Sequence, residues 1–358
     1  MKLLVISNMY PSIKDPVYGT FVQSFVENMN ILNKGGKTDI IVVKGRDGNI
    51  LQKIWKYFRF YFLSLFTLLF CKYDVVYVHT ITYPIIPIRI ACLFKNIPLV
   101  FNVHGGDVLT RGKIAARLKE IAKPLLKNAK LIVSPSVFFK DVLLREFPFL
   151  TEQNIFVSPS GGIDSSFFYK KKNKENNEFT IGYVSRISVA KGWDTLLQSL
   201  SILLGKINFK LIVAGRGTQV KEFKKMIVDF GLTEHVQYIG PVPYKQLPSV
   251  YNQLDLFVFP TCLEESLGLV GIEAMASGVP VVGSKIGGLT DYIIDGYNGF
   301  YFLPGNSESL ATKILNYYYL DANEKAELGR GAFLTAQKYE SDEVNNALYK
   351  ELVKRLSY

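Results

Sequence analysis

The sequence predicts an α/β fold of two Rossmann-like domains, each built on a parallel β-sheet. Its 358 residues are more than one hydrophobic core usually supports, so we expect two domains. Short apolar segments typical of buried strands alternate with helical segments along the chain, as in parallel sheets. A polar run over 169–179 marks a break in composition near the middle. We therefore expect one domain over residues 1–165, a second over 166–340 and a last helix over 341–358.

Each expected strand is a short run of apolar and β-branched residues, which favours burial on both faces. In the first half these runs are Leu3–Ser7, Ile40–Val43, Val75–Val78, Leu99–Val103 and Leu131–Val133. In the second half they are Thr180–Val184, Lys210–Ala214, Val236–Ile239, Leu256–Phe259 and Val279–Val282. Helices are expected over 51–71, over 108–127 and from residue 269, the last one ended by Gly278 and Pro280. The polar run is either the linker itself or an early loop of the second domain; we favour the loop, with the crossover near 160–168.

Positive charge is concentrated in the first half of the chain. Residues 1–170 carry 22 Lys and Arg against 11 Asp and Glu, whereas residues 171–358 carry 20 of each. An anionic partner is therefore expected for the first domain, and the sequence has no nucleic-acid-binding signature. Residues 51–71 combine three cations with many aromatic residues, but their apolar part is too short to span a bilayer. This segment is expected to be an interfacial helix on an anionic membrane surface, a helix covering its own sheet, or both.

Few residues suit disulfide or metal chemistry. Three cysteines in apolar surroundings favour a reducing cytoplasm, and a peripheral position on the inner face of the membrane is expected. The three histidines are scattered and no Asp-x-Asp pair occurs. The chain begins with a strand-like run rather than a signal peptide. We expect no metal ion and no other cofactor.

The segment 260–284 places two carboxylates at a junction between a strand and a helix. Glu265 precedes the expected helix and Glu273 lies eight positions later inside it. A helix N-terminus at the carboxyl edge of a sheet attracts phosphate, and Gly268 would let a ligand approach the backbone. Glu265 could bind sugar hydroxyls and Glu273 a ribose. The alternatives are a carboxylate that only stabilises the helix dipole and a solvated surface glutamate.

Two cations follow the strand Thr180–Val184 and should emerge at the same edge of the second sheet. Arg186 can hold a diphosphate with two parallel hydrogen bonds, and Lys191 can add a point charge. Ligands of open α/β sheets bind at this edge. The alternative is a solvated loop.

The segment ESLGLVGIEAMASGVPVVGS resembles the Glu-x7-Glu signature of the retaining glycosyltransferases of family 4. Further segments resemble that family in the same order: residues 16–22, 101–107, 157–164, 182–192, 211–217 and 238–243. The resemblance implies the GT-B fold, in which two Rossmann-like domains face each other across a cleft and a C-terminal helix crosses back to the first domain. It covers nearly the whole chain.

The resemblance also implies roles for individual residues. It makes His104, Arg186, Lys191 and Glu265 catalytic, with His104 over the donor sugar. It assigns donor binding to Gly19, Val242, Ser266, Leu267, Gly268, Leu269 and Glu273. Asp107 would contact the acceptor; its alternative is to cap the helix expected over 108–127.

The function that follows is a retaining, metal-independent transfer of a sugar from a nucleoside diphosphate to a hydroxyl of a glycan acceptor. Uridine diphosphate is the expected donor nucleotide, and the basic first domain suggests a lipid-linked acceptor in surface polysaccharide assembly. Two other functions remain open. A nucleotide-sugar epimerase of the same architecture would release a free epimer, and a non-catalytic binding protein would tolerate loss of Lys191 or Glu265.

Overall fold

The computed structural model describes residues 1–15, 18–46, 48–110, 112–168 and 178–356, and within them the chain forms two compact units. Unit 1 comprises Met1–Gly162 and Asp342–Tyr358, and unit 2 comprises Ile163–Ser341. The chain therefore passes from unit 1 to unit 2 after Gly162. Most of the polar run over 169–179 lies outside the described residues.

Unit 1 contains a parallel sheet of six strands in its described part, in the order β2-β1-β3-β4-β5-β6. Its elements are β1 (Lys2–Tyr10), α1 (Thr20–Leu32), β2 (Lys37–Lys44), α2 (Ile50–Phe70), β3 (Val75–His79), α3 (Ile85–Ala91), β4 (Leu99–Asn102), α4 (Lys113–Lys127), β5 (Leu131–Ser134), α5 (Val137–Glu146), the 3-10 turn η1 (Glu152–Asn154), β6 (Ile155–Val157) and α12 (Ser341–Leu356). Because β1 is followed by β2 on one side and β3 on the other, the strand order reverses between β1 and β3.

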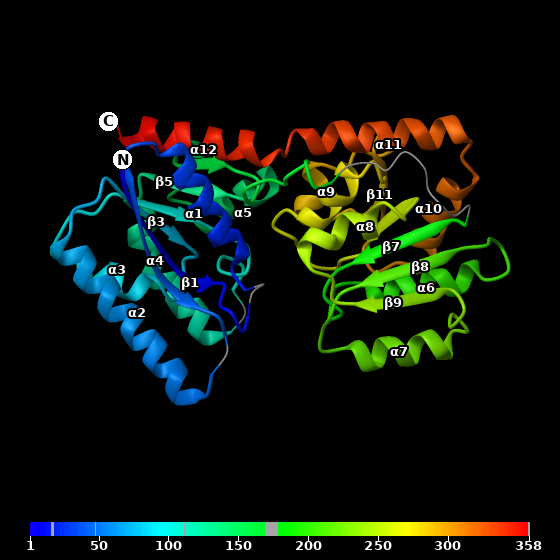
Figure 1. The fold of residues 1–358 in the computed structure, drawn as a ribbon, viewed down its shortest axis with the longest axis horizontal. Coiled ribbons are helices and arrows are strands. Elements are labelled where there is room, and N and C mark those ends of the chain that lie inside the picture. The colour runs from blue at the N-terminus through cyan, green and yellow to red at the C-terminus, as the bar shows by residue number, and fades with distance from the viewer. Residues whose placement is uncertain (16–17, 47, 111, 169–177, 357–358) are drawn as a thin grey trace. The chain divides into compact units, whose positions relative to one another are not determined.

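Helices cover both faces of this sheet. On one face α1 and α12 bury an apolar cluster that joins Val22 and Leu352 to Leu3 and Val5 of β1. On the other face α2, α3, α4 and α5 cover a second cluster. Figure 1 shows α12 on the opposite side of the sheet from α2 and α3. The last helix of the chain is thus part of the first unit.

Unit 2 contains six parallel strands among the described residues, in the order β12-β11-β10-β7-β8-β9. Its elements are β7 (Thr180–Val184), α6 (Trp193–Leu203), β8 (Lys210–Ala214), α7 (Val220–Asp229), β9 (Val236–Gly240), η2 (Tyr244–Gln246), α8 (Leu247–Tyr251), β10 (Leu256–Phe259), α9 (Leu269–Ala276), β11 (Val281–Ser284), η3 (Gly287–Asp291), β12 (Gly299–Phe302), α10 (Ser307–Tyr319) and α11 (Ala322–Gln337). This is the strand order of the Rossmann fold, and it reverses between β7 and β10.

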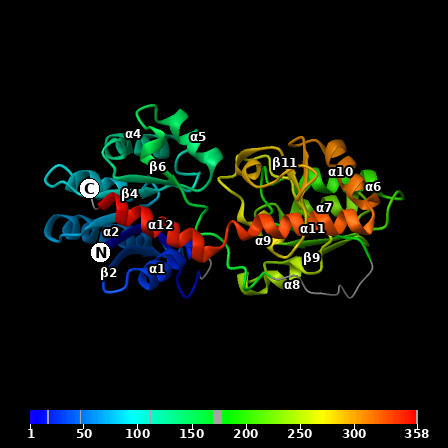
Figure 2. The same ribbon diagram turned by 90° about the horizontal axis from the view of Figure 1, so that it is seen from above.

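The helices of unit 2 also lie in two layers. One face of its sheet carries α6, α7 and α10, and the other carries α8, α9 and α11. Figures 1 and 2 show α11 running alongside α9. The predicted fold of two Rossmann-like parallel sheets is confirmed.

Two predicted boundaries were wrong for identifiable reasons. The strand expected at Val279 begins at Val281, because the Val279 amide donates to the carbonyl of Ala274 and caps the end of α9. The helix expected from residue 108 begins at Lys113, because Val108 and Leu109 donate to the carbonyl of Gly105 in a separate turn. The edge strands β6 and β12 are short and were not predicted. No helix in the described part of the chain is long and apolar enough to cross a membrane.

Candidate active site

The loops that follow β7 and β10 in unit 2 are joined backbone to backbone. These two strands are neighbours, so their carboxyl ends lie side by side where the strand order reverses. The amide of Cys262 donates to the carbonyl of Ala190 at 2.8 Å. Gly192 has φ of 73°, and a Cβ there would stand 1.7 Å from the carbonyl oxygen of Pro260. Glycine is therefore required at 192, and it lets the two loops meet at the edge where ligands of such sheets bind.

Lys191 and Glu265 face each other from these two loops. The Nζ of Lys191 donates to Oε1 of Glu265 at 2.5 Å, and the same oxygen accepts from the hydroxyl of Thr261 at 2.9 Å. The two side chains are 10% and 17% exposed, so the ion pair is largely shielded from solvent. Residues 74 positions apart in the sequence thus share one small site. Removing either charge would leave its partner poorly compensated.

Arg186 lies on the same β7 loop but points to solvent. It is exposed, and within the described residues its side chain has no hydrogen bond or ion pair. The loop that carries it is braced from below, since the buried hydroxyl of Tyr183 donates to the carbonyls of Arg186 and Lys191 at 3.4 and 3.2 Å. An uncommitted guanidinium on a braced loop is available for an anionic ligand.

The loop carrying Glu265 leads directly into α9. Gly268 precedes the first helical residue with φ of 86°, and in this described segment no side chain caps the helix. The first amide groups of α9 are therefore open to an anion, as at other helix N-termini. Of the predicted donor-binding residues here, Leu267 is buried in the core, whereas Ser266, Gly268 and Leu269 are half-buried. The side chain of Leu267 packs in the core, which leaves its backbone to serve a ligand.

Glu273 is separate from the Lys191–Glu265 pair. It is 5% exposed and accepts a hydrogen bond of 2.9 Å from the hydroxyl of Tyr251. Burial raises the pKa of Glu273 to about 7, although the Tyr251 hydrogen bond acts in the opposite direction. The carboxyl therefore exchanges its proton near neutral pH. Val242, predicted to bind the donor, follows β9 and packs against the apolar cluster that contains Tyr251.

Gly19 lies in unit 1 after β1, where the strand order of that sheet reverses. It follows β1 and precedes α1 with φ of 74°, and a Cβ there would lie 2.6 Å from the backbone of Met9 and Tyr10. Only glycine fits so close an approach in a left-handed conformation. The glycine loop predicted after the first strand thus holds a required glycine, although residues 16 and 17 of that loop lie outside the described part.

His104 follows β4 and contacts a second histidine, His79, at the end of β3. The Nδ1 of His79 and the Nε2 of His104 are 3.1 Å apart, so one ring donates to the other. Phe21 packs against His104 with 4.5 Å between ring centroids. Burial lowers the pKa of His104 to about 4 and that of His79 well below its usual value. Both rings are neutral at physiological pH.

His79 was not predicted as a site residue. The sequence does contain a pattern that indicates the pair, because the neighbouring parallel strands β3 and β4 each end at or next to a histidine. The other ring nitrogen of His79, Nε2, is buried and has no hydrogen-bond partner among the described residues. Thr80 next to it has φ of 73°, a left-handed conformation that is strained for a β-branched residue. Strain of this kind clusters at functional sites.

Asp107 binds backbone groups of its own unit. Its two oxygens accept from the amides of His104 at 2.9 Å and Ile81 at 3.1 Å, and the residue is 5% exposed. This carboxylate ties the loop after β3 to the loop after β4. It does not cap the helix expected from residue 108, since α4 starts at Lys113 with Gly112 before it. A group of three or more His, Cys, Asp or Glu side chains that could hold a metal ion does not occur among the described residues.

Two family models match this chain one after the other. The model "Glycosyltransferase Family 4" matches residues 26–164, and "Glycosyl transferases group 1" matches residues 164–332. The chain belongs to the family 4 glycosyltransferases. The model of residues 164–332 includes Arg186, Lys191, Glu265 and Glu273.

Two individual relatives share about one third of the aligned residues with this chain, over less than half of its length. The chain is 32% identical over 144 residues to an uncharacterised glycosyltransferase of Methanocaldococcus jannaschii, which is 40% of this chain and 37% of that protein. It is 36% identical over 140 residues to the capsular polysaccharide biosynthesis glycosyltransferase CapM of Staphylococcus aureus, 39% and 36% of the two chains. The chain spans 37 to 61% of the length of the first curated relatives it matches.

A solved structure resembles the whole chain. HepE of Anabaena, solved in complex with UDP, aligns with a TM-score of 0.79 over 99% of this chain and 100% of its own, at 21% identity. The same protein has also been solved with UDP-glucose. At this identity the similarity establishes the fold.

Proposed function

We propose that this protein is a retaining glycosyltransferase that moves a sugar from uridine diphosphate to a hydroxyl of a lipid-linked glycan during surface polysaccharide assembly. The observation that carries the proposal is the Lys191–Glu265 pair, held at the strand-order reversal of unit 2 beside the open N-terminus of α9. Cation, carboxylate and free amides at one place suit a ligand that has both a diphosphate and sugar hydroxyls.

The diphosphate would bind at the β7 loop and the start of α9. Arg186 and Lys191 would stabilise the negative charge that grows on the departing diphosphate, with the amides of residues 266–269 as further donors. Removing one such preorganised group typically raises a reaction barrier by ~3–4 kcal/mol. Because these protein groups can meet the charge, we propose that the reaction requires no metal ion.

Glu265 and Glu273 would hold the two sugars of the donor. Glu265 would accept from a hydroxyl of the transferred sugar once a phosphate draws Lys191 toward itself. Glu273, beside Tyr251 and near Val242, would bind the ribose when its carboxyl is ionised. HepE, which shares this fold, has been solved with UDP and with UDP-glucose, and this favours uridine diphosphate as the nucleotide.

Unit 1 would contribute the acceptor site. His104, neutral because of burial, would hydrogen-bond a hydroxyl of the donor sugar, and Gly19 would let the diphosphate come close to the backbone. The leaving phosphate would take the proton of the attacking hydroxyl on the same face, which retains the anomeric configuration. CapM is a glycosyltransferase of capsular polysaccharide biosynthesis, and the similarity to it supports a glycan acceptor. We place the reaction in the cytoplasm, where the free thiols of Cys71, Cys92 and Cys262 would stay reduced.

The test begins with binding and proceeds to turnover. UDP-linked sugars are screened for thermal stabilisation of the full chain, and the best binder is incubated with a lipid-linked oligosaccharide acceptor, with and without a chelator. We expect a product with the donor's anomeric configuration by NMR, undiminished by the chelator. The variant Lys191→Met should lose both binding and turnover, and the control Lys225→Met, at an exposed lysine of α7, should keep both. Release of a free epimer, or loss of turnover with the chelator, would refute the proposal.

A further inference from the structure

The solvent-facing side of α2 carries a continuous row of large apolar side chains, which we call the aromatic ridge. Its members follow one another at steps of four, three, four, four and four positions, so they lie on one side of the helix. They are Leu51, Trp55, Phe58, Phe62, Phe66 and Phe70, each between 51% and 72% exposed. Successive rings are in contact, with centroids 5.6, 6.4, 6.1 and 4.7 Å apart.

Such a ridge is unusual on a helix that already buries its other side. Phe60, Ser64 and Leu68 face the core of unit 1, so the opposite side of α2 would ordinarily be polar. A helix of 21 residues is about 30 Å long, and the ridge occupies nearly all of it. Exposed apolar surface of this extent marks an interaction site rather than a scatter of single residues.

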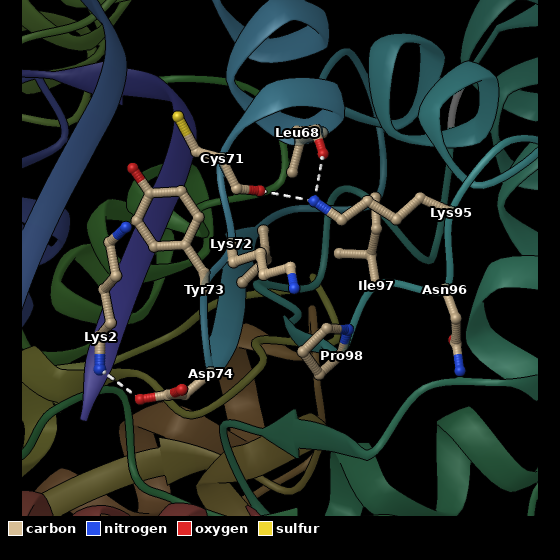
Figure 3. Close-up of a pocket in the computed structure, with 11 residues that line it drawn as sticks. Lys2, Leu68, Cys71, Lys72, Tyr73, Asp74, Lys95, Asn96, Ile97 and Pro98 are labelled. Atoms are coloured by element: carbon tan, nitrogen blue, oxygen red, sulfur yellow. Dashed lines mark hydrogen bonds between the residues drawn. The ribbon is translucent and has the colours of Figure 1, made fainter.

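The helix is fixed at both ends. Asn49 and Gln52 form a reciprocal capping box at its start. At its end the Nζ of Lys95 donates to the carbonyls of Leu68 and Cys71, at 3.2 and 2.6 Å. Figure 3 shows this arrangement at the wall of a hollow of about 520 Å³ that opens beside the end of α2. The aromatic ridge is therefore presented on a rigid helix.

The charges around the ridge are positive. Lys53, Lys56 and Arg59 lie on α2, and this helix has no acidic residue. Lys72 follows its end and is exposed at the hollow of Figure 3. Neighbouring α3 and the turn after it add further exposed apolar residues, Ile86, Ile90, Leu93 and Phe94. An apolar strip framed by cations matches a surface that is anionic outside and apolar beneath.

We propose that the aromatic ridge of α2 docks unit 1 onto an anionic lipid bilayer, with the helix lying flat among the headgroups. The rings would enter the boundary between headgroups and acyl chains while Lys53, Arg59 and Lys72 pair with lipid phosphates. A second copy of this chain is a poorer occupant, because a symmetric contact through this face would bring like charges together. This proposal does not depend on the donor or on the chemistry of transfer.

Tryptophan emission provides a direct test. The chain has two tryptophans, of which Trp55 is 64% exposed on the ridge and Trp193 is 5% exposed in unit 2. The full chain, without any nucleotide, is mixed with vesicles of phosphatidylcholine containing about one third phosphatidylglycerol. We expect a blue shift of the emission and co-sedimentation, both weaker with pure phosphatidylcholine and at high salt. The Trp193→Phe variant should show the same shift.

Matched variants distinguish binding through the aromatic ridge from non-specific binding through any exposed apolar residue. Replacing Phe58, Phe62 and Phe66 by Gln keeps Trp55 and should lower the vesicle-bound fraction by about tenfold or more, since binding scales with apolar area buried. The control replaces three comparably exposed residues of unit 2, Val228, Leu303 and Tyr319, by Gln and should bind as the parent does. Circular dichroism confirms folding of both. Absence of vesicle binding by the parent would overturn the proposal, as would a dimer in solution that only the ridge variant abolishes.

Discussion

The buried carboxyl of Glu273 makes the stability of unit 2 depend on pH in a way that one substitution should remove. In the folded state its pKa is about 7, against an ordinary value of 4.5. Between these values the folded chain holds a proton that the unfolded chain has released, so stability falls as pH rises through this range and levels off above pH 7. Integrating between pH 5 and pH 8 gives a loss of about 2.5 kcal/mol from this group.

The variant Glu273→Gln keeps an acceptor for the Tyr251 hydroxyl but carries no proton that titrates. The difference in free energy of unfolding, variant minus parent, should therefore be about 2.5 kcal/mol larger at pH 8 than at pH 5. Urea unfolding at several pH values measures this, with Trp193 emission reporting unit 2 in a Trp55→Phe background.

The control for this experiment is Glu222→Gln, at an exposed glutamate of α7, which should keep the parent's loss of stability between pH 5 and pH 8. A constant difference between parent and Glu273→Gln across the pH range would refute the assignment of a raised pKa. If Glu273 also binds ribose, UDP affinity of the parent should rise with pH through 7, and that of the variant should not.

Three further predictions concern the candidate site of unit 2 and the histidine pair of unit 1. Lys191→Met should destabilise unit 2 by about 3 kcal/mol because it strands a shielded carboxylate, and adding Glu265→Gln should recover most of this loss in urea unfolding without restoring UDP binding. Gly192→Ala should cost at least about 2 kcal/mol more than Gly205→Ala, because both glycines have φ near 74° but only the first has backbone within reach of a Cβ; equal losses in thermal melts would contradict this. Replacing His79 by Gln should lower kcat about tenfold with little change in donor KM, because it disturbs the tautomer of its histidine partner; an unchanged kcat would show that the contact is structural.

Much of the fold could be predicted because its signals are local. Buried strands such as Thr180–Val184 and Leu256–Phe259 coincide with short runs of apolar and β-branched residues, and the structure has them with these bounds. The segment over 51–71 forms the single helix α2, one residue earlier at each end. The errors occurred where a backbone group is used by a neighbouring element, as at Val279, which caps α9 instead of starting a strand.

The candidate site could be predicted in composition but not in pairing. Lys191 and Glu265 were each selected from the strand they follow, yet their ion pair depends on β7 and β10 being neighbours, which local patterns do not specify. The hydrogen-bond partner of Glu273 could not be predicted either. A charge within an apolar helix indicates that some partner exists, but Tyr251 lies 22 positions away on another element. His79 lies at the end of an expected strand, and its contact with His104 depends on the pairing of β3 with β4, which the local sequence does not specify.

The position of α12 has a consequence for how the protein is made. Leu348 and Leu352 close the face of the sheet formed by residues near the start of the chain, including Leu3 and Val5. On the ribosome, α1 can cover only its own part of this face until all of unit 2 and then α12 have been synthesised. Although most of unit 1 precedes unit 2 in the chain, its core can be completed only after unit 2 has been made.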